Sequence, residues 1–532
     1  MKATYIDYSE TSSFSDTVIR YIDQDPKLTP FISYKPTLDG LEQLLANKKV
    51  KADRQVLVKI LREQYSEILK AKDPDLQLVS ENIELLSRET TYTVTTGHQL
   101  NLFTGPLYFI FKIVTAINLA RELKSKFAEK NFVPVYWMAT EDHDFEEINH
   151  TYIAGKKIAW PIETKGATGK ISTLNIAAAV KEYTAVLGVS ENADKLCGII
   201  ETAYLKHSTL ASATRFLVNE LFKAYGLVIL DADQPELKQQ FTEIIKEDII
   251  GQNSFQTINS SIEKLSEAGI EAQVNPREIN FFYLLNGLRE RLVFENNRYV
   301  VLNTDISFSE EELKTDIQSH PEHFSPNVVM RPLYQEVILP NIAYVGGGAE
   351  VVYWLELKEN FAYYGIDFPI LILRNSGLIG GNKAEQAMKK LDLSPADLFK
   401  SAEELKKQWV INHSQHVLNL TDEWLEFKCL FEKIKLRAHK IDPTLSASTE
   451  AIRARLEKAI HNLEKKLVKA EKRNHSEALN RIDTFKQKLF PNGGLQERSD
   501  NFGLFYVQYG EEFINSLIET FTPLDFKFTI LQ

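Results

Sequence analysis

The chain has 532 residues, of which 44% are hydrophobic and 25% are charged, and its formal net charge is −11. The composition is ordinary for a globular protein, and the length implies several domains or one core with large insertions. A protein that binds the nucleic-acid backbone usually needs a basic surface, so the negative net charge argues against a nucleic-acid partner.

No apolar run approaches the roughly 20 residues of a membrane-spanning helix, and residues 1–7 lack a signal-peptide core. The two cysteines, Cys197 and Cys429, lie far apart and without metal-ligand spacing. This predicts neither a disulfide framework nor a cysteine-based zinc site. Together these features predict a cytoplasmic protein with no membrane partner.

Residues 1–90 have helix-like apolar spacing interrupted by prolines, and we predict an N-terminal helical wrap. Residues 91–250 are predicted to form the first part of an α/β core with a helical insertion. They open with a strand at 92–96, a helix from Leu107 to about Phe127 and a strand at 132–138. A polar loop follows each strand. In an open parallel sheet small ligands bind at that edge, so both loops are candidates for a site.

A further apolar run at residues 226–230 ends in Asp231 and Asp233. This is the pattern of a buried parallel strand that presents polar groups at its carboxyl end. The carboxylates could contact a ligand, although capping of the helix after Pro235 is the commoner explanation.

Residues 251–338 change to short alternating runs, which predict a mixed α/β insertion. Three arginines of this insertion could bind an anionic substrate: Arg277, Arg289 and Arg291. Ordinary surface or salt-bridged positions are the favoured explanation for them.

The core resumes over residues 339–382, where a strand runs into three glycines and a helix is predicted at 351–364. Glycines let backbone N–H groups approach a ligand, and a helix start favours negative charge. A tight strand-to-helix turn would need the same residues. A last buried strand at 368–373 ends at Arg374, whose planar guanidinium can meet a phosphate or a carboxylate.

Residues 383–490 are helical and rich in charge. Apolar residues alternate by four and three along the second half, as in a coiled-coil seam: Leu456, Ile460, Leu463 and Leu467. With the helix before Pro443 they predict an antiparallel hairpin. The alternative is a plain helical subdomain, but the length and charge favour an arm used in self-association. Residues 491–532 are predicted to return to the core and to close with an edge strand at 521–530.

The loop at residues 141–150 is dense in groups that bind metals or move protons. Its spacing matches no zinc template, so a hydrogen-bonding site is favoured and no metal ligands are assigned. His98 and Gln99 lie in the other loop, where capping of the next helix is the alternative. The chain has no Gly-x-x-x-x-Gly-Lys-Ser/Thr loop and no Gly-x-Gly-x-x-Gly fingerprint, which disfavours a standard kinase or dehydrogenase.

Several blocks of sequence occur in order along most of the chain. The most specific is Glu-Asp-His-Asp-Phe at residues 141–145, and the others are found at residues 96–99, 103–108, 134–139, 331–335, 343–350 and 489–498. In these blocks the chain resembles the bacillithiol biosynthesis cysteine-adding enzyme family.

The resemblance implies a Rossmann-like parallel-sheet core related to class I aminoacyl-tRNA synthetases, with inserted connecting domains and a coiled-coil arm that forms a homodimer. It also implies a reaction, in which the carboxyl of cysteine is joined to the amine of glucosaminyl-malate in the last step of bacillithiol biosynthesis. The chain lacks a His-x-Gly-His signature and the lysines of the second synthetase signature. These departures disfavour a tRNA ligase and leave open whether ATP is the activating cofactor.

We predict catalytic roles for His98, Asp142, His143 and Asp144. Predicted to bind substrate or nucleotide are Gly97, Gln99, Asn101, Thr104, Gly105, Asn149, His150, Arg331, Gln335, Gly346, Gly347, Glu350 and Arg374. Arg331 and Arg374 are expected to face the malyl carboxylates. Two alternatives remain: a nucleotidyltransferase-like enzyme acting on another small substrate, and a non-catalytic dimeric binding or scaffold protein.

Overall fold

The computed structural model describes residues 1–69 and 73–532. The chain divides into two compact units. The first contains Ala3–Leu378 and Leu495–Thr529, together with Met1, and the second contains Ile379–Gly494, Lys2 and the last three residues. No helix among the described residues is long and apolar enough to cross a membrane.

The first unit is built around a five-stranded sheet in the order β13-β12-β2-β3-β6, in which every neighbouring pair is parallel. The strands are β2 (Thr91–His98), β3 (Asn131–Met138), β6 (Val228–Asp231), β12 (Asn341–Gly346) and β13 (Ile370–Leu373). Seven of the eight residues of β2 are buried, as expected for a strand covered on both faces. The parallel α/β core predicted from the sequence is confirmed.

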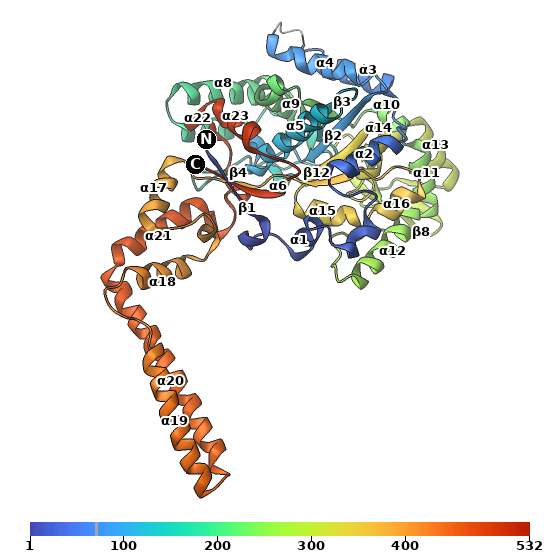
Figure 1. The fold of residues 1–532 in the computed structure, drawn as a ribbon. Helices are drawn as coiled ribbons and strands as arrows, with labels where there is room; N and C mark the ends of the chain where they lie inside the picture. Colours follow the sequence, from blue (N-terminus) through green and yellow to red (C-terminus); the bar gives the residue numbers. More distant parts are fainter. Residues whose placement is uncertain (70–72) are drawn as a thin grey trace. The chain divides into compact units, whose positions relative to one another are not determined.

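The crossover from β2 to β3 is helix α5 (Tyr108–Lys126), which contacts both strands. Its inner face joins a cluster of buried apolar side chains that includes Val94, Leu119, Leu123 and Ile342. Figure 1 shows α5 lying along the sheet. The two strands pair in register from Thr91 to His98, so their carboxyl ends lie next to each other.

The N-terminal residues form helices α1 (Asp16–Ile22), α2 (Leu38–Asn47), α3 (Arg54–Tyr65) and α4 (Gln77–Leu85). They also form strand β1 (Ala3–Asp7), which pairs in a small sheet of order β1-β15-β14. In this sheet β15 (Lys527–Leu531) is the central strand between β1 and β14 (Gly377–Ile379), so the prediction of an edge strand at the C-terminal end was wrong. The reason is the pairing with β1, which the local pattern does not reveal.

From Phe145 to Glu267, besides β6, the chain forms the single turn α6 (Phe145–Ile148), one hairpin and six helices of five or more residues. The hairpin consists of β4 (His150–Ile153) and β5 (Lys156–Ala159). The helices are α7 (Ala177–Leu187), α8 (Glu191–Lys206), α9 (Leu210–Phe222), α10 (Pro235–Gln239), α11 (Thr242–Gly251) and α12 (Asn253–Glu267).

The next segment carries a second five-stranded sheet of order β10-β9-β8-β7-β11, in which neighbours are antiparallel. Its elements are β7 (Phe281–Leu285), β8 (Leu288–Glu295), β9 (Arg298–Val301), β10 (Ser307–Phe308), α13 (Glu310–Ser319) and β11 (Phe324–Pro326), followed by α14 (Arg331–Ile338). We refer to residues 281–326 as the insertion sheet.

The helix predicted at 351–364 is split into α15 (Gly348–Leu355) and α16 (Lys358–Tyr363). Between them the backbone tightens, since Glu356 N donates to Tyr353 O and Leu357 N donates to Trp354 O, each at 3.0 Å. The buried Glu356 turns inward and accepts a hydrogen bond from Gln273 N at 2.7 Å. Helix periodicity alone does not reveal this tertiary contact.

Burial raises the pKa of Glu356 to about 7, against an ordinary value of 4.5. Between these two values the folded chain keeps a proton that the unfolded chain releases, so stability falls as pH rises through this window. Glu356→Gln keeps the acceptor without the charge. We expect the melting temperature of this variant to exceed that of the native chain above pH 7 and to converge with it below pH 4.5. Thermal unfolding across pH tests this, with the more exposed Glu359→Gln as control; a pH-independent difference would contradict it.

The second unit is helical, with α17 (Gly381–Leu391), α18 (Ala402–His413), α19 (Thr421–Ile441), α20 (Leu445–Asn474) and α21 (Ser476–Leu489). Helices α19 and α20 run side by side as the predicted hairpin (Figure 1). A small core of Leu405, Val410, Leu479 and Ile482 joins the other helices. The chain then re-enters the first unit with α22 (Gly503–Tyr509) and α23 (Glu512–Thr520).

Candidate active site

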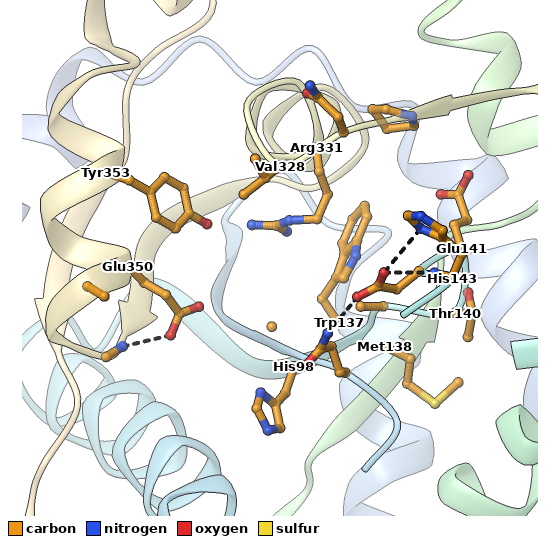
Figure 2. Close-up of a pocket in the computed structure, with 18 of the residues that line it drawn as sticks. His98, Trp137, Met138, Thr140, Glu141, His143, Val328, Arg331, Glu350 and Tyr353 are labelled. Carbon is orange, nitrogen blue, oxygen red and sulfur yellow. Dashed lines mark hydrogen bonds and ion pairs between the residues drawn. The ribbon is translucent and has the colours of Figure 1, made fainter. Parts of the chain in front are cut away.

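A cavity of about 860 Å³ opens at the carboxyl ends of β2, β3 and β12. Its wall contains the end of β2, residues 139–143 after β3, and residues 347–350 at the start of α15. Figure 2 shows Glu350 and Tyr353 on one side, Glu141 and His143 on the other, and Arg331 reaching in between. The three turns predicted to carry the site therefore surround one hollow.

The glycine turn is held by a buried ion pair. Lys112 of α5, with a side chain only 5% exposed, pairs with Glu350 and donates to Gly97 O at 3.0 Å. Glu350 also accepts hydrogen bonds from Tyr344 Oη and Gly347 N, each at 2.8 Å. Burial acts to raise the pKa of Glu350, but Lys112 and these hydrogen bonds outweigh it, so the pKa lies below its ordinary value. An ionised carboxylate here suits a hydroxyl or ammonium group better than a phosphate.

His98, the last residue of β2, packs its ring against Tyr108 and Phe109, with centroids 5.5 and 5.3 Å apart. Burial lowers the pKa of His98 to about 3, so the ring is neutral near pH 7. Its Nε2 is shielded from solvent and has no hydrogen-bond partner among the described residues. His98 can therefore form one hydrogen bond with a ligand through Nε2, but its ring is uncharged.

Asp142 organises the loop after β3. Its Oδ1 accepts the backbone N–H groups of His143 at 2.7 Å and Asp144 at 3.3 Å, and its Oδ2 accepts Gln99 Nε2 at 2.7 Å. The contact with Gln99 joins the two loops of the βαβ unit. The Asp142 side chain remains 30% exposed and lines the cavity, so further lone pairs can meet a ligand.

Arg289 fixes the protonation state of His143. The Arg289 Nη1 atom lies 2.6 Å from His143 Nδ1, and arginine has only donors. The Nδ1 atom must therefore accept, and the proton of the neutral ring sits on Nε2. Burial, and then the charge of Arg289, lower the pKa of His143. His143 is thus a neutral hydrogen-bond donor at the cavity wall.

Arg331 lies in an aromatic box. Its guanidinium is 5.6, 5.5 and 6.0 Å from the ring centroids of Trp137, Tyr344 and Trp354. Nη1 donates to Gln335 Oε1 at 3.0 Å, whereas the buried Nη2 has no hydrogen-bond partner within residues 1–69 and 73–532. A largely desolvated cation with a free donor at a cavity wall can bind an anion. The buried Gln335 stands behind Arg331 and orients it.

Arg374 also lines the cavity, but its donors are committed to the protein. Nη2 donates to Glu497 Oε1 at 2.7 Å, and Nη1 donates to Ser376 Oγ at 2.9 Å and Asn375 O at 3.1 Å. The Glu497 side chain has no exposed surface. This pair ties the end of β13 to the C-terminal segment, and mainly the charge of Arg374 reaches the cavity.

The remaining predicted site residues do not line the cavity: Asn101, Thr104, Gly105, Asp144, Asn149, His150, Gln335 and Gly346. The turn at 101–105 faces the protein interior, because Asn501 Nδ2 donates to Phe103 O and Gly105 O, each at 2.8 Å. Asn149 Oδ1 lies 3.0 Å from His150 Nδ1 at the start of β4. These residues are therefore not proposed to contact a ligand directly.

Sequence reasoning missed Lys112 and the role of Arg289. The available signal for Lys112 was a single lysine inside the apolar run at 109–114, where a charge must find a partner. Arg277 and Arg291, for which surface positions were favoured, are exposed but line the cavity. No other described residue pairs with either guanidinium, so both are free to meet a ligand.

Asp231, the last residue of β6, and Asp233 make contacts within the protein and do not line the cavity. Asp231 Oδ1 accepts Thr140 Oγ1 at 2.5 Å, and Asp233 pairs with Lys238 at 3.1 Å and Lys170 at 3.0 Å. Helix α10 has no side-chain cap, so capping does not explain either residue. Lys238 also pairs with Glu141 Oε1 at 2.5 Å, which anchors the cavity wall after β3.

Comparison with known proteins identifies the family. The model described as "Bacillithiol biosynthesis BshC, N-terminal Rossmann-like domain" matches residues 1–375, and "Bacillithiol biosynthesis BshC, C-terminal coiled-coil domain" matches residues 378–532. The chain belongs to the BshC family. The predicted resemblance, the Rossmann-like core and the coiled-coil domain are thereby confirmed.

Relatives in the BshC family match along the whole chain. Proteins from Flavobacterium psychrophilum and Flavobacterium johnsoniae are 44% identical over 536 residues and 45% identical over 534 residues, covering 100% of both chains in each case. A protein from Bacillus cytotoxicus is 29% identical over 511 residues, or 93% of this chain and 94% of the relative. Each of the three is named "Putative cysteine ligase BshC".

Proposed function

We propose that this BshC-family chain is a ligase that joins the carboxyl of L-cysteine to the amine of glucosaminyl-malate through an amide bond, the last step of bacillithiol biosynthesis. The observation that carries the proposal is the single cavity in which the Glu350 wall faces the Asp142 and His143 wall. The names of the relatives support the same reaction class.

Amide formation from a carboxylate needs an activated acyl group and a neutral amine. The acyl donor is a phosphate-activated form of the cysteine carboxyl. The amine nitrogen attacks its carbonyl carbon, the C–N bond forms, and the C–O bond to the phosphate group breaks. As its lone pair enters the new bond, the nitrogen becomes acidic, and Asp142, whose partly exposed carboxylate lines the cavity, accepts its proton.

His143 has a separate role in this reaction. Its Nε2–H donates to the carbonyl oxygen on which negative charge develops, because Arg289 keeps Nδ1 an acceptor. The nitrogen of His98 that has no protein partner, together with the ionised Glu350, holds the polar groups of cysteine or the sugar hydroxyls on the opposite wall. Gln99 keeps Asp142 in place.

An arginine wall recognises the malyl group. Arg277 and Arg291 are exposed and without side-chain partners among the described residues, and the Nη2 of Arg331 is free. Two carboxylates require several such donors, which arginine supplies as a planar fork. Arg374 contributes its charge but few free donors. We therefore assign the binding of the malyl carboxylates to Arg277 and Arg291 rather than to Arg374.

Replacing this wall should affect binding more than chemistry. We expect the double variant Arg277→Gln/Arg291→Gln to raise KM for glucosaminyl-malate by about 100-fold, because each charged hydrogen bond contributes about 1.5–3 kcal/mol, while kcat changes little. Steady-state kinetics test this. Arg298→Gln is the matched control, since Arg298 lies on the same insertion sheet and pairs with Glu312 outside the cavity. An increase in KM for cysteine alone would assign the wall to the other substrate.

The direct test of the reaction is product mass. Purified protein is incubated with labelled cysteine and glucosaminyl-malate, with and without ATP, and the amide is followed by mass spectrometry. Product formed only with ATP identifies the activator. A thermal shift caused by a nucleotide but by neither substrate would favour a nucleotidyltransferase on another substrate. Absence of product in every condition, including added cell extract, would refute the ligase assignment.

The proposed assembly is a homodimer formed through the coiled-coil domain. Several large apolar side chains of α19 are exposed in the single chain: Leu425, Leu430, Leu436 and Ile441, with exposed fractions of 53%, 51%, 61% and 82%. Apolar side chains along a charged helical hairpin are typical of a contact with another helix. The mass of the full-length protein in solution, measured by light scattering, tests this proposal.

A further inference from the structure

A tight turn after α13 stacks two histidines on the insertion sheet. Pro321 opens a 3₁₀ turn over Pro321–His323, and His323 N donates to His320 O at 3.0 Å. Side chains three residues apart eclipse in such a turn, so the His320 and His323 rings stack 4.9 Å apart with an interplanar angle of 18°. Glu322 Oε1 lies 3.2 Å from His320 Nδ1. The backbone thus gathers two imidazoles and one carboxylate.

The three side chains lie close enough to one another to share a metal ion. His320, Glu322 and His323 each offer one ligand atom, and these atoms lie within 4.8 Å of one another. The side chains are 53%, 31% and 22% exposed, so an ion from solvent can reach them. None of the three residues lines the cavity of the candidate active site.

The surroundings of His323 provide a second observation. Its Nδ1 lies 3.2 Å from Tyr283 Oη and 3.5 Å from Asp316 Oδ2, and Tyr283 Oη donates to the same Asp316 oxygen at 2.9 Å. A metal-bound histidine commonly gives its other ring N–H to a carboxylate, which fixes the ring and raises its basicity. Asp316 is placed to do this while Nε2 of His323 binds the ion.

We propose that His320, Glu322 and His323 form a Zn²⁺ site with Asp316 as the supporting carboxylate. Two imidazoles and one carboxylate match a zinc ligand set with an open fourth position, whereas Mg²⁺ and Ca²⁺ prefer all-oxygen sites. Zinc bonds of about 2.0–2.2 Å require the donor atoms to close in, which rotation of these partly exposed side chains allows.

The proposed zinc site is also linked to two residues of the cavity wall, Arg289 and Glu141. The turn leads directly into β11, where Ser325 Oγ accepts Arg289 Nε at 3.1 Å. On its other side Glu322 O accepts Lys238 Nζ at 3.3 Å, and Lys238 is the partner of Glu141. Bound zinc therefore stabilises the insertion sheet, and the melting temperature should rise with zinc concentration.

The test uses full-length protein stripped with a chelator and titrated with ZnCl₂ by calorimetry. Native protein should bind one more equivalent of Zn²⁺ than His320→Asn/His323→Asn, and Co²⁺ should give visible d–d bands in the native protein but not in this double variant. The matched control is His416→Asn/His461→Asn, which changes two exposed histidines of the coiled-coil unit. This control should bind zinc like the native chain.

Asp316→Asn separates a zinc site from a fortuitous cluster. It should keep the stoichiometry and weaken affinity by about 10–100-fold, as expected when a supporting carboxylate is lost. Equal melting temperatures of all variants in chelator show that folding is intact. Equal zinc stoichiometry and affinity in native protein and His320→Asn/His323→Asn would overturn the proposal. No ligase activity is measured, so the result is independent of the proposed reaction.

Discussion

His143→Ala is expected to lower kcat for amide formation by about 10²–10³-fold, the usual effect of removing one donor to a developing oxyanion. The melting temperature should change little, because the side chain is 46% exposed and Arg289 keeps its bonds to Ser325 and Pro326. Product formation measured at saturating substrates, together with thermal unfolding, tests both statements.

Two further variants define the role of this ring. His150→Ala removes a partly exposed histidine that does not line the cavity, and it should retain activity. His143→Gln keeps an N–H donor and should recover part of the lost rate. Because the pKa of His143 is lowered, the acidic limb caused by its protonation should lie below the ordinary value of 6.5. Full activity of His143→Ala would remove this residue from the mechanism.

Glu497→Gln is expected to destabilise the first unit by about 3–5 kcal/mol, because it leaves the buried Arg374 without a counter-charge. Glu497 also accepts Ser376 Oγ at 3.1 Å and Gly377 N at 2.9 Å, so several contacts weaken together. Urea unfolding monitored by circular dichroism gives the loss. For comparison, Arg62→Gln breaks an exposed pair with Glu84 and should cost less than about 1 kcal/mol.

The double variant Arg374→Met/Glu497→Gln distinguishes a structural role from a role in substrate binding. It removes both charges, so no buried charge is left unpaired, while the amide oxygen at position 497 can still accept hydrogen bonds from Ser376 and Gly377. If Arg374 acts mainly through Glu497, the double variant should be more stable than Glu497→Gln and should keep KM for glucosaminyl-malate within a few-fold of the native value. A large increase in KM with restored stability would show that Arg374 binds substrate directly, as the sequence first indicated.

The sequence was most informative where structure depends on neighbouring residues. The β-branched and aromatic run around Val94, the apolar helix after Pro106 and the run before Asp231 each predicted an element that the structure contains. Their order predicted a parallel sheet, and parallel pairing places the loops after β2, β3 and β12 at one edge. That is why the sequence predicts Gly97, His98, His143 and Gly347 around one cavity.

The same reasoning could not predict which side chains are free. Arg374 and Arg291 both have polar neighbours in the sequence. Arg374 nevertheless donates to Glu497, which lies 123 residues away in the sequence. Asn501 lies almost 400 residues further along the chain, and its hydrogen bonds hold the turn at residues 101–105 toward the protein interior. Lys112 has the sequence context of a core position, and only Glu350 explains its charge.

The amino-acid sequence by itself determined the family, the parallel core, the helical hairpin and the loops that form the cavity, because periodicity, turn residues and strand order are local or collinear properties. The tertiary structure alone decided that His143 is a donor, that Arg374 is committed and that Arg277 and Arg291 are available. The physical reason is that a charge or a lone pair takes its role from its nearest partner in space, and that partner is commonly distant along the chain.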